Sequence, residues 1–563
     1  MKEKTNLSYS VRPLVSMRDL VQSSCRLYAD RPAFLYWAAG GVVTVHYREV
    51  YEEILAFTSY LHEQRLSGKR IALIGKNCYG WALSYLTVLS GVGSIVPLDK
   101  DLRADEVASL VRDSEAAAII YTHEEEQKVA PLAEECKLIA LDEIDLFLGR
   151  GRELRREGDR SFEKHTVDPT ALSILLYTSG TTGVGKGVML SQYNICSNIM
   201  AVRSRIDLGP QDRSLSMLPL HHTFECMAGF LTFFYSGASI AYNRSLKTLQ
   251  ADLSIFSPTV LVCVPLVLET FYSAVSRKYK KMKGGEALMR TQFALAKTLP
   301  SASARRKLFS AVSAAFGGKL TRILVGAAPL PPHIFEAYER FGYRVYLGYG
   351  LTETSPVITV HDDWYHSAND VGFPLPGQTV IIDDPDEEGV GELCVCGPNV
   401  MLGYYHDPEQ TAQVLKDGFF HTGDLAQKLP NGAYRICGRR KSMIVAKNGK
   451  KIFPEELEHF LNQSSLIEES LVYEGKDGSV TVSVYPNEAE ALRLLGTEQK
   501  PPEKEYLDAV APLVKKEVAR VNAMFPFYKA MTRIVLRTEN FVRTTTQKIK
   551  RKEAENYREE YIV

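Results

Sequence analysis

The 563-residue chain lacks an excess of charge of either sign, because Lys plus Arg and Asp plus Glu both number 67. Proteins that bind nucleic acids normally carry a strong basic excess, so the composition argues against such a partner. The first residues, MKEKTNLSYSVRP, contain no apolar segment of the kind that forms the core of a signal peptide. Together these absences predict a globular cytoplasmic protein.

Long hydrophobic runs are also missing. The two most apolar stretches, residues 81–98 and 226–242, are interrupted by Gly and Ser. Neither provides the roughly 20 consecutive apolar residues that cross a bilayer. We therefore expect both to be buried elements of a large core, with peripheral contact at a membrane surface as the alternative.

The few cysteines do not form a spacing pattern typical of disulfides or of a metal site. The nine cysteines are scattered from Cys25 to Cys437, and only Cys394 and Cys396 are close together. Their spacing does not match a zinc site, and an odd count does not suggest a disulfide framework. We expect reduced thiols in a reducing compartment.

Short apolar runs alternate with amphipathic stretches through the first half of the chain. The predicted strands are 70–75, 93–98, 117–121, 172–177, 259–264 and 322–325, and the helices between the first of them are 81–91 and 104–114. Such alternation is typical of an α/β fold with a parallel sheet covered on both faces by helices.

The sequence pattern changes near residue 372, after which short strand-like runs and turn residues replace the alternation of strands and helices. A single core rarely grows beyond roughly 250–300 residues, so several parts are expected. We predict an N-terminal core, 1–438, built from two doubly wound sheets plus a small barrel-like β lobe. A hinge, 439–441, then leads to a small mobile α+β domain, 442–563, which has a long helix near 506–519.

The run YTSGTTGVGKGVMLS, which begins at Tyr177, follows an apolar strand and suits a polyphosphate. Its glycines allow backbone N–H groups to approach closely, its hydroxyls donate hydrogen bonds, and its lysine supplies a positive charge. The candidate phosphate ligands are Thr178, Ser179, Gly180, Thr181, Thr182 and Lys186.

A Walker A loop is the first alternative, because Gly180 to Lys186 satisfies G-x-x-x-x-G-K. However, Gly187 occupies the position where that motif needs Ser or Thr to ligate Mg²⁺. Residues 187–190 also have the pattern of a strand, whereas a Walker A loop opens a helix. We therefore reject that motif.

The loop instead resembles the signature of the adenylate-forming (ANL) superfamily, which includes acyl-CoA synthetases, peptide-synthetase adenylation domains and luciferases. Six further segments match that family in the same order, and the resemblance runs from about residue 32 to 552. The family usually has Pro where this chain has Gly185, and we expect glycine there to loosen the loop.

The segment LPLHHTFE, residues 218–225, is the first of the six. The resemblance implies that His222 lies beside the reacting carboxylate. Amino-acid-activating relatives usually have an Asp after this motif to pair with the substrate's amino group. Here Glu225 follows Phe224, as it often does in acyl-CoA synthetases, so the pattern disfavours an amino acid.

The segments GAAPL and YGLTETSP resemble the walls of the family's nucleotide pocket. By this resemblance Tyr349 stacks on adenine, Thr352 contacts the α-phosphate and Glu353 binds Mg²⁺, an ion that prefers oxygen ligands. The remaining pocket residues implied here are Gly326, Ala327, Ala328, Gly350 and Leu351.

Two later segments supply the rest of the site. In HTGDL, Asp424 matches the family's ribose clamp, and in GRRK, Arg439 matches a ribose and phosphate contact while Lys441 falls at the hinge. The resemblance implies that the C-terminal domain rotates about this hinge between adenylation and transfer to the thiol. Lys447 and Gly449 would then face a tunnel for CoA.

The segment VRTTTQKIKR places Lys548 at the position of the family's adenylation lysine. Val542 and Gln547 depart from the usual Pro and Gly, which affects the turn before the lysine and not the lysine itself. A solvated basic tail is the alternative for this segment.

The resemblance implies an acid–thiol ligase that uses ATP, Mg²⁺ and CoA, with Lys548, Glu353, His222 and Thr352 as catalytic residues. A carboxylate is already ionised at neutral pH, so its activation needs charge stabilisation and positioning more than a general base. The segments MIVAKNGKKIFPEELE and SPTVLVCVPLVLE most resemble those of bacterial long-chain fatty-acid–CoA ligases, so a medium- or long-chain fatty acid is the expected substrate. The alternatives are an aryl-acid–CoA ligase, an acyl-AMP ligase that loads an acyl carrier protein, and a binder without activity.

Overall fold

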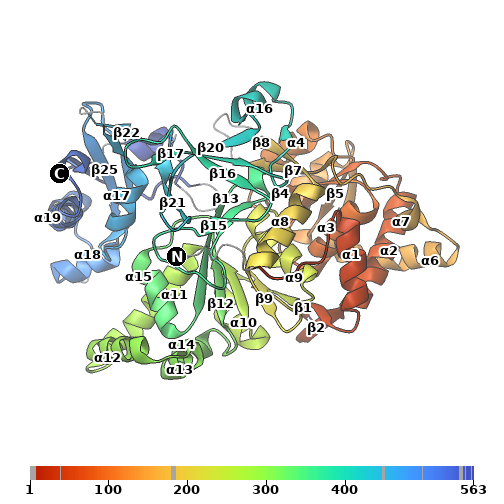
Figure 1. The fold of residues 1–563 in the computed structure, drawn as a ribbon, viewed down its shortest axis with the longest axis horizontal. Coiled ribbons are helices and arrows are strands. Elements are labelled where there is room, and N and C mark those ends of the chain that lie inside the picture. Colours follow the sequence, from red (N-terminus) through yellow and green to blue (C-terminus); the bar gives the residue numbers. More distant parts are fainter. Residues whose placement is uncertain are drawn as a thin grey trace. The chain divides into compact units, whose positions relative to one another are not determined.

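The computed structural model describes residues 8–38, 40–178, 185–446, 450–497, 499–543, 549–551, 553–558 and 561–563 (Figure 1). The chain divides into two compact units. Unit 1 comprises Met1–Val380, Val395–Phe420 and Asn431–Tyr434. Unit 2 comprises Ile381–Cys394, His421–Pro430 and Arg435–Val563.

The first large sheet of unit 1 has seven strands in the order β18-β8-β7-β4-β3-β5-β6. Its strands are β3 (Arg70–Ile74), β4 (Ser94–Leu98), β5 (Ala118–Tyr121), β6 (Lys137–Ala140), β7 (Leu172–Thr178), β8 (Lys186–Ser191) and β18 (Gly403–Tyr404). The strands from β7 to β6 run parallel, whereas β8 pairs antiparallel with both β7 and β18. Apolar residues on both faces of the parallel strands explain their short continuous hydrophobic runs.

The second large sheet has nine strands in the order β15-β14-β13-β12-β11-β9-β10-β1-β2. Its strands are β1 (Pro32–Ala38), β2 (Gly41–His46), β9 (Arg213–Ser216), β10 (Ser239–Tyr242), β11 (Val260–Cys263), β12 (Arg322–Val325), β13 (Arg344–Gly350), β14 (Val357–Val360) and β15 (Phe373–Pro374). Its centre is parallel and both of its edges are antiparallel. Two sheets with parallel centres confirm the predicted α/β class.

Helices cover these sheets. Figure 1 shows α11 to α15, in green, gathered beside β12, and their apolar faces share one core cluster with that sheet. The main helices of unit 1 are α1 (Met17–Leu27), α2 (Tyr47–Glu63), α3 (Tyr79–Gly91), α4 (Ala104–Asp113), α6 (Ile144–Arg156), α8 (Gln192–Arg205), α10 (Leu249–Phe256), α11 (Pro265–Lys281), α12 (Gly285–Thr298), α13 (Ala302–Leu308), α14 (Ser310–Ala315) and α15 (Pro332–Phe341).

Both apolar stretches singled out in the sequence are core elements. Residues 81–98 form most of α3 and β4, and every α3 residue from Trp81 to Gly91 is buried. Residues 226–242 form the π-helix η4 (Glu225–Leu231), α9 (Thr232–Tyr235) and β10, all buried. A helix that is apolar all round belongs in a core. Among the described residues, no helix is long and apolar enough to cross a membrane.

Unit 2 has its own core, built on the four-stranded sheet β24-β25-β26-β27 and the helices that pack on it. Its elements are β22 (Ile444–Val445), β23 (Lys451–Ile452), α17 (Pro454–Leu461), β24 (Ile467–Glu474), β25 (Val480–Pro486), α18 (Glu488–Leu495), α19 (Glu503–Asn522), β26 (Arg533–Leu536) and β27 (Tyr561–Ile562). The small α+β part that the sequence predicted is therefore present.

A five-stranded, mainly antiparallel sheet is the predicted β-rich lobe. It contains β16 (Thr379–Asp383), β17 (Val390–Cys396), β19 (Leu415–Lys416), β20 (Phe419–Lys428) and β21 (Tyr434–Arg439). The boundary between the two units passes through several of these strands. The proposed division into 1–438, a hinge at 439–441 and 442–563 stays a prediction.

Candidate active site

The phosphate-loop candidate is the hairpin between β7 and β8. Tyr177 pairs with Gly187, and Thr178 with Lys186, across the two strands. The loop residues Ser179, Gly180, Thr181 and Thr182 lie outside the described residues. The chain continues into a strand after the loop, as predicted, and a Walker A loop would instead continue into a helix.

Gly185 stands where the hairpin is too crowded for a side chain. A Cβ atom on this residue would lie 2.9 Å from the carbonyl oxygen of Thr178. The strand next to it is anchored by the Tyr177 hydroxyl, which donates to Asp113 Oδ2 at 2.5 Å. Burial, reinforced by this carboxylate, raises the pKa of the Tyr177 hydroxyl, so it remains a donor.

The short strand β18 ties this hairpin to the motif that contains Glu353. It pairs with β8, and the Met401 amide donates to the Glu353 carbonyl at 2.8 Å. The Tyr404 hydroxyl donates to Glu353 Oε1 at 3.0 Å, and Lys186 Nζ lies 5.3 Å from the centre of the Tyr404 ring. One tyrosine therefore contacts both a candidate phosphate ligand and the candidate magnesium ligand.

The electrostatics of Tyr404 suit this position. Burial and the neighbouring Glu353 carboxylate raise the pKa of its hydroxyl far above the ordinary value. The hydroxyl therefore stays protonated and donates to the carboxylate at every accessible pH. A cation over an aromatic face is also attracted to the ring's negative quadrupole.

The segment LPLHHTFE lies against the YGLTETSP segment. Thr223 Oγ1 donates to Thr352 Oγ1 at 3.1 Å, and Thr223 is buried. Thr352 and Glu353 belong to the 3₁₀ turn η6 (Thr352–Thr354), which follows β13 and its residues Tyr349 and Gly350. The turn is fixed because Thr354 is fully buried and its hydroxyl donates to the Pro356 carbonyl at 2.7 Å.

His222 has a defined orientation in the same segment. Its backbone carbonyl accepts from the Cys226 amide at 3.0 Å, and its Nδ1 accepts from the Phe224 amide at 3.4 Å. Because Nδ1 accepts, the ring proton of neutral His222 sits on Nε2, which can donate a hydrogen bond to an anion. The Phe224 ring also faces Gly326, whose added Cβ would lie 2.9 Å from Phe224 Cζ.

The GAAPL segment follows β12 and presents small side chains to solvent. Gly326 is buried, whereas Ala327 and Ala328 are exposed. Ala327 has a φ of 70°, in the left-handed region that residues with a Cβ atom rarely occupy. Such strain persists where the surrounding structure imposes it, often at ligand sites.

Glu225 lies deeper than the other residues of its segment. It begins the π-helix η4, is only 1% exposed, and neither of its carboxylate oxygens has a hydrogen-bond partner among the described residues. Burial raises its pKa to about 8, against a smaller opposing effect of Ser216. Glu225 is therefore mainly neutral at pH 7 and unsuited to pairing with an amino group. π-Helices occur frequently at functional sites.

Unit 2 brings together the two residues of the candidate ribose clamp. Asp424 lies on β20 and is 4% exposed, and Arg439 Nε lies 3.0 Å from Asp424 Oδ1. Next to them, Glu392 accepts from the Gly423 amide at 2.8 Å and from Arg440 Nη1 at 2.8 Å. These contacts fix the backbone around Asp424 to the strand that contains Arg439.

His421 lies beside Cys394, a neighbour that the sequence pattern did not predict. Asp383, Glu392, Cys394 and His421 converge from three strands, with ligand atoms within 4.8 Å of one another. The Cys394 sulfur and His421 Nδ1 are 3.3 Å apart, and burial raises the pKa of the thiol to about 12. Because Arg440 and the Gly423 amide already engage Glu392, the cluster is satisfied by the protein itself.

Comparison with known proteins gives matches along nearly the whole chain. Residues 21–405 match the profile of the AMP-binding enzyme family, and residues 441–562 match that of the AMP-binding enzyme C-terminal domain. The chain belongs to the AMP-binding enzyme family. Within that family the matches are to AMP-forming acid–CoA ligases, as the resemblance of the motifs implied.

Individual relatives of this AMP-binding enzyme are distant. Long chain acyl-CoA synthetase 1 of Arabidopsis thaliana is 29% identical over 490 residues, covering 78% of this chain and 73% of that protein. A chloroplastic long-chain-fatty-acid–[acyl-carrier-protein] ligase of the same plant, AEE15, is 26% identical and covers 95% of this chain and 84% of its own length.

A solved structure shares the fold. The o-succinylbenzoate CoA synthetase of Bacillus subtilis, in complex with its acyl-adenylate intermediate, superposes with a TM-score of 0.72 at 19% identity. The match covers 97% of this chain and 99% of that one, which confirms the fold class for both units.

Several predicted site residues of this AMP-binding enzyme cannot be placed. Lys447, Gly449 and Lys548 lie outside the described residues. The ends of the segment around Lys548 are described: Arg543 and Ile549 form an antiparallel bridge. Lys441 is exposed.

The described lysines next to the loop predicted to face CoA are engaged by other residues. Lys451 Nζ lies 3.1 Å from Asp386 Oδ2, and Lys450 Nζ lies 5.0 Å from the centre of the Tyr528 ring. Both contacts lie within unit 2, and the CoA-facing role of this loop stays a prediction.

Proposed function

We propose that this AMP-binding enzyme activates a medium- or long-chain fatty acid with ATP, releasing pyrophosphate, and transfers the acyl group to CoA with release of AMP. The observation that supports it most is the contact of Tyr404 with both Lys186 and Glu353. These three residues join the phosphate hairpin to a carboxylate that can face a metal–nucleotide substrate. Fatty acid is the proposed acid because the curated relatives reported above act on long-chain acids.

The donor set around Glu353 fits Mg²⁺. One carboxylate oxygen accepts from the Tyr404 hydroxyl, and no partner for the other oxygen is found among the described residues. Mg²⁺ binds in proteins through one or two carboxylates together with substrate phosphates. When bound there, the ion would neutralise charge on the phosphate oxygens.

The residues of the chain divide the remaining work. The substrate carboxylate attacks the α-phosphorus of ATP, the bond from that phosphorus to the bridging oxygen breaks, and pyrophosphate leaves. Lys186 and the hairpin N–H groups hold the departing phosphates, and Thr352 and His222 Nε2 donate toward the reacting oxygens. Asp424 and Arg439 hold the ribose, and Lys548 stabilises the charge that builds at the reacting centre.

An acyl carrier protein as the thiol acceptor is the second candidate. It is favoured by one observation, because the carrier-protein ligase AEE15 aligns with 95% of this chain. A carrier's phosphopantetheine arm presents the same thiol as CoA, so the adenylation site alone does not discriminate between the two.

Release of pyrophosphate with a panel of acids, measured with and without CoA or a holo acyl carrier protein, tests the proposal. We expect pyrophosphate release that depends on a medium- or long-chain fatty acid, and thioester formation when CoA is added. Release without a CoA thioester but with an acylated carrier would replace the first candidate by the second. Release that depends on no acid would exclude both.

Replacing the adenylation lysine separates the half-reactions. Lys548→Ala should abolish acid-dependent pyrophosphate release while largely sparing the conversion of a supplied acyl-adenylate to acyl-CoA, because only the first step builds charge at the phosphorus. Lys550→Ala, two residues away on the same basic segment, is the matched control. Equal loss of both half-reactions would mean that Lys548 has a different role.

A further inference from the structure

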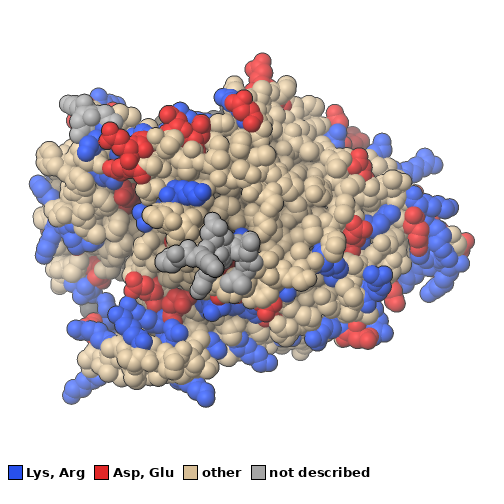
Figure 2. Space-filling view, viewed as in Figure 1, with Lys and Arg blue, Asp and Glu red and all other residues tan. Residues whose placement is uncertain are grey.

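The charge of this neutral protein is distributed very unevenly. Between residues 277 and 319 the chain contains eleven Lys or Arg and a single acidic residue, Glu286, whereas the whole sequence has 67 of each sign. This segment runs from the end of α11 through α12, α13 and α14. Figure 2 shows Lys and Arg gathered around an uncharged band over α12 and α13, at the lower left.

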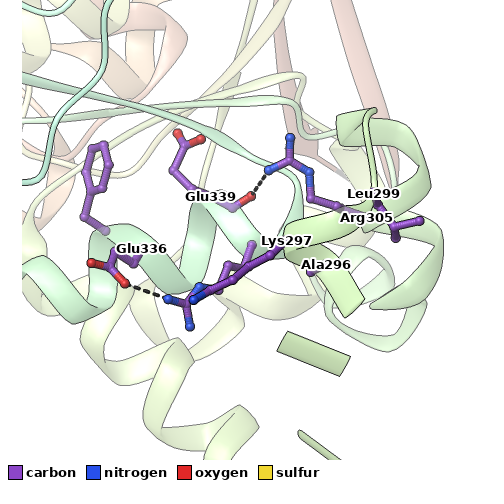
Figure 3. A pocket seen from close by; sticks show the side chains of 8 residues that line it. Ala296, Lys297, Leu299, Arg305, Glu336 and Glu339 are labelled. Carbon is purple, nitrogen blue, oxygen red and sulfur yellow. Dashed lines mark hydrogen bonds and ion pairs between the residues drawn. The ribbon is translucent and has the colours of Figure 1, made fainter. Parts of the chain in front are cut away.

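Most of these cations have no protein partner. Arg305 donates to the Glu339 carbonyl beside the hollow drawn in Figure 3, and Arg306 donates to the Gly342 carbonyl, so these two arginines are engaged within the fold. Arg290 lies 3.9 Å from Glu286. The following are exposed and have no ion pair within the part of the chain that the structure describes: Arg277, Lys278, Lys280, Lys281, Lys283, Lys297, Lys307 and Lys319.

Large apolar side chains are exposed among the same cations. Met282, between Lys281 and Lys283 in the connection from α11 to α12, is 49% exposed. Leu288 and Leu295 are 42% and 47% exposed, and their spacing of seven residues places them on one face of α12. Exposed apolar side chains inside a basic patch are typical of a surface that enters the headgroup region of a bilayer.

We propose that this surface, called here the α11–α14 surface, docks on anionic lipid bilayers. Cations on it would approach the lipid phosphates while Met282, Leu288 and Leu295 reach the acyl boundary. Lys and Arg can extend their charged ends past such apolar residues to the headgroups. A soluble polyanion such as a nucleic acid would use the cations alone and leave the apolar residues in water. The inference concerns a surface outside the active site and does not depend on which acid is activated.

The magnitude of the effect follows from the number of free cations. Each Lys or Arg near an anionic bilayer multiplies binding about fivefold, within a Debye length of about 8 Å at physiological salt. Removing four of the eight should weaken binding by about two to three orders of magnitude. Binding should also fall steeply as salt is added.

Co-sedimentation of the full chain with vesicles tests this. One set of vesicles is pure phosphatidylcholine, and in the other set a third of the lipid is phosphatidylglycerol. We expect binding only to the second set. The variant Lys278→Gln, Lys281→Gln, Lys283→Gln, Lys297→Gln should lose about a hundredfold or more in affinity. It should keep acid-dependent pyrophosphate release, because none of these residues lies in the site described above.

The matched control removes four lysines of unit 2. Lys476, Lys504, Lys515 and Lys516 are likewise exposed and without an ion pair among the described residues, so their change to Gln gives the same net charge. We expect the control to bind vesicles within about threefold of the original chain. Equal losses in the two variants would overturn the proposal, as would absence of binding to anionic vesicles at low salt.

A third variant separates a bilayer from other polyanions. Changing Met282, Leu288 and Leu295 to Ser should weaken binding to anionic vesicles about tenfold or more and leave binding to heparin unchanged. If this variant binds vesicles as the original chain does, the α11–α14 surface recognises charge alone. The proposal of a bilayer would then be wrong, and an acidic macromolecule would be the occupant.

Discussion

Changing Tyr404 to Phe tests the arrangement of the phosphate hairpin most directly. The change removes the hydroxyl that donates to Glu353 Oε1 at 3.0 Å and keeps the ring beneath Lys186. A hydrogen bond to a charged group contributes about 1.5–3 kcal/mol. Glu353 is partly exposed, so the lower value applies, and about 1.5 kcal/mol corresponds to about a tenfold change.

We expect this loss in kcat/KM for magnesium–ATP, measured by pyrophosphate release at saturating acid. The neighbouring Tyr405 provides the control, because its hydroxyl accepts a hydrogen bond from Arg70 Nη1 at 2.7 Å and makes none with Glu353 among the described residues. Tyr405→Phe should therefore change kcat/KM by less than about twofold.

A double-mutant cycle decides whether the hydroxyl acts through Glu353. If it does, Tyr404→Phe should have little further effect once Glu353 is changed to Ala, because either change alone removes the hydrogen bond between the hydroxyl and the carboxylate, whereas Gln would keep an acceptor oxygen. Fully additive losses would refute the reasoning. So would a Tyr404→Phe enzyme with the kinetics of the original, or a Tyr405→Phe enzyme that is equally impaired.

Three further changes have defined outcomes. Gly185→Ala should raise KM for ATP, because its Cβ would lie 2.9 Å from the Thr178 carbonyl oxygen; an unchanged KM would show that the hairpin adapts freely. Asp424→Asn should raise KM for ATP at least about tenfold, because the carboxylate is proposed to accept from the ribose hydroxyls. It should change the free energy of unfolding by less than about 1 kcal/mol, because its partner Arg439 is 59% exposed. Loss of stability with a normal KM would contradict the ribose role. Glu225 has a folded-state pKa raised to about 8, so its contribution to stability is fully present below its unfolded value and is lost as pH rises through the folded value. Relative to Glu225→Gln, the original chain should therefore lose about 1.4 kcal/mol of unfolding free energy per pH unit between about pH 5 and 8, in denaturant titrations; parallel pH profiles would argue against a buried neutral carboxyl.

The fold was predictable because its parallel strands are buried on both faces. Runs such as residues 71–74 and 117–121 are continuously apolar, and the structure confirms the strands predicted around them as β3 and β5. The long helix predicted near 506–519 is the core of α19, with Tyr506, Val510 and Val514 on its buried face. Periodicity of this kind is local, so it can be read without knowing what packs against it.

The contacts of the site were predictable only in part. Strand β18 has two residues, too few to show any periodicity, so neither the strand nor the role of Tyr404 could be found in the sequence. His421 lies beside Cys394 because two strands that are 27 positions apart in the chain pair with each other. Such pairings depend on tertiary structure and leave no local signal.

Gly185 shows where reasoning from composition was incomplete. Glycine in place of the family's proline predicts a looser loop through its entropy in the unfolded chain. The structure adds a steric cause, because the Thr178 carbonyl leaves no room for a Cβ atom. The close approach of two backbone segments is a property of the hairpin and is not encoded in the identity of either residue alone.

The pairing of β18 with β8 limits where insertions and deletions can be tolerated as the sequence evolves. The backbone leaves the site after Thr354 and returns at Met401, whose amide bonds to Glu353 itself. The separation between the hairpin and Glu353 is therefore set by the two-residue pairing of β18 with β8 and by this hydrogen bond, and not by the length of chain between them. Insertions or deletions in the turn at residues 384–389, between β16 and β17, should leave the hairpin and Glu353 in register, and variation in length among relatives should concentrate there.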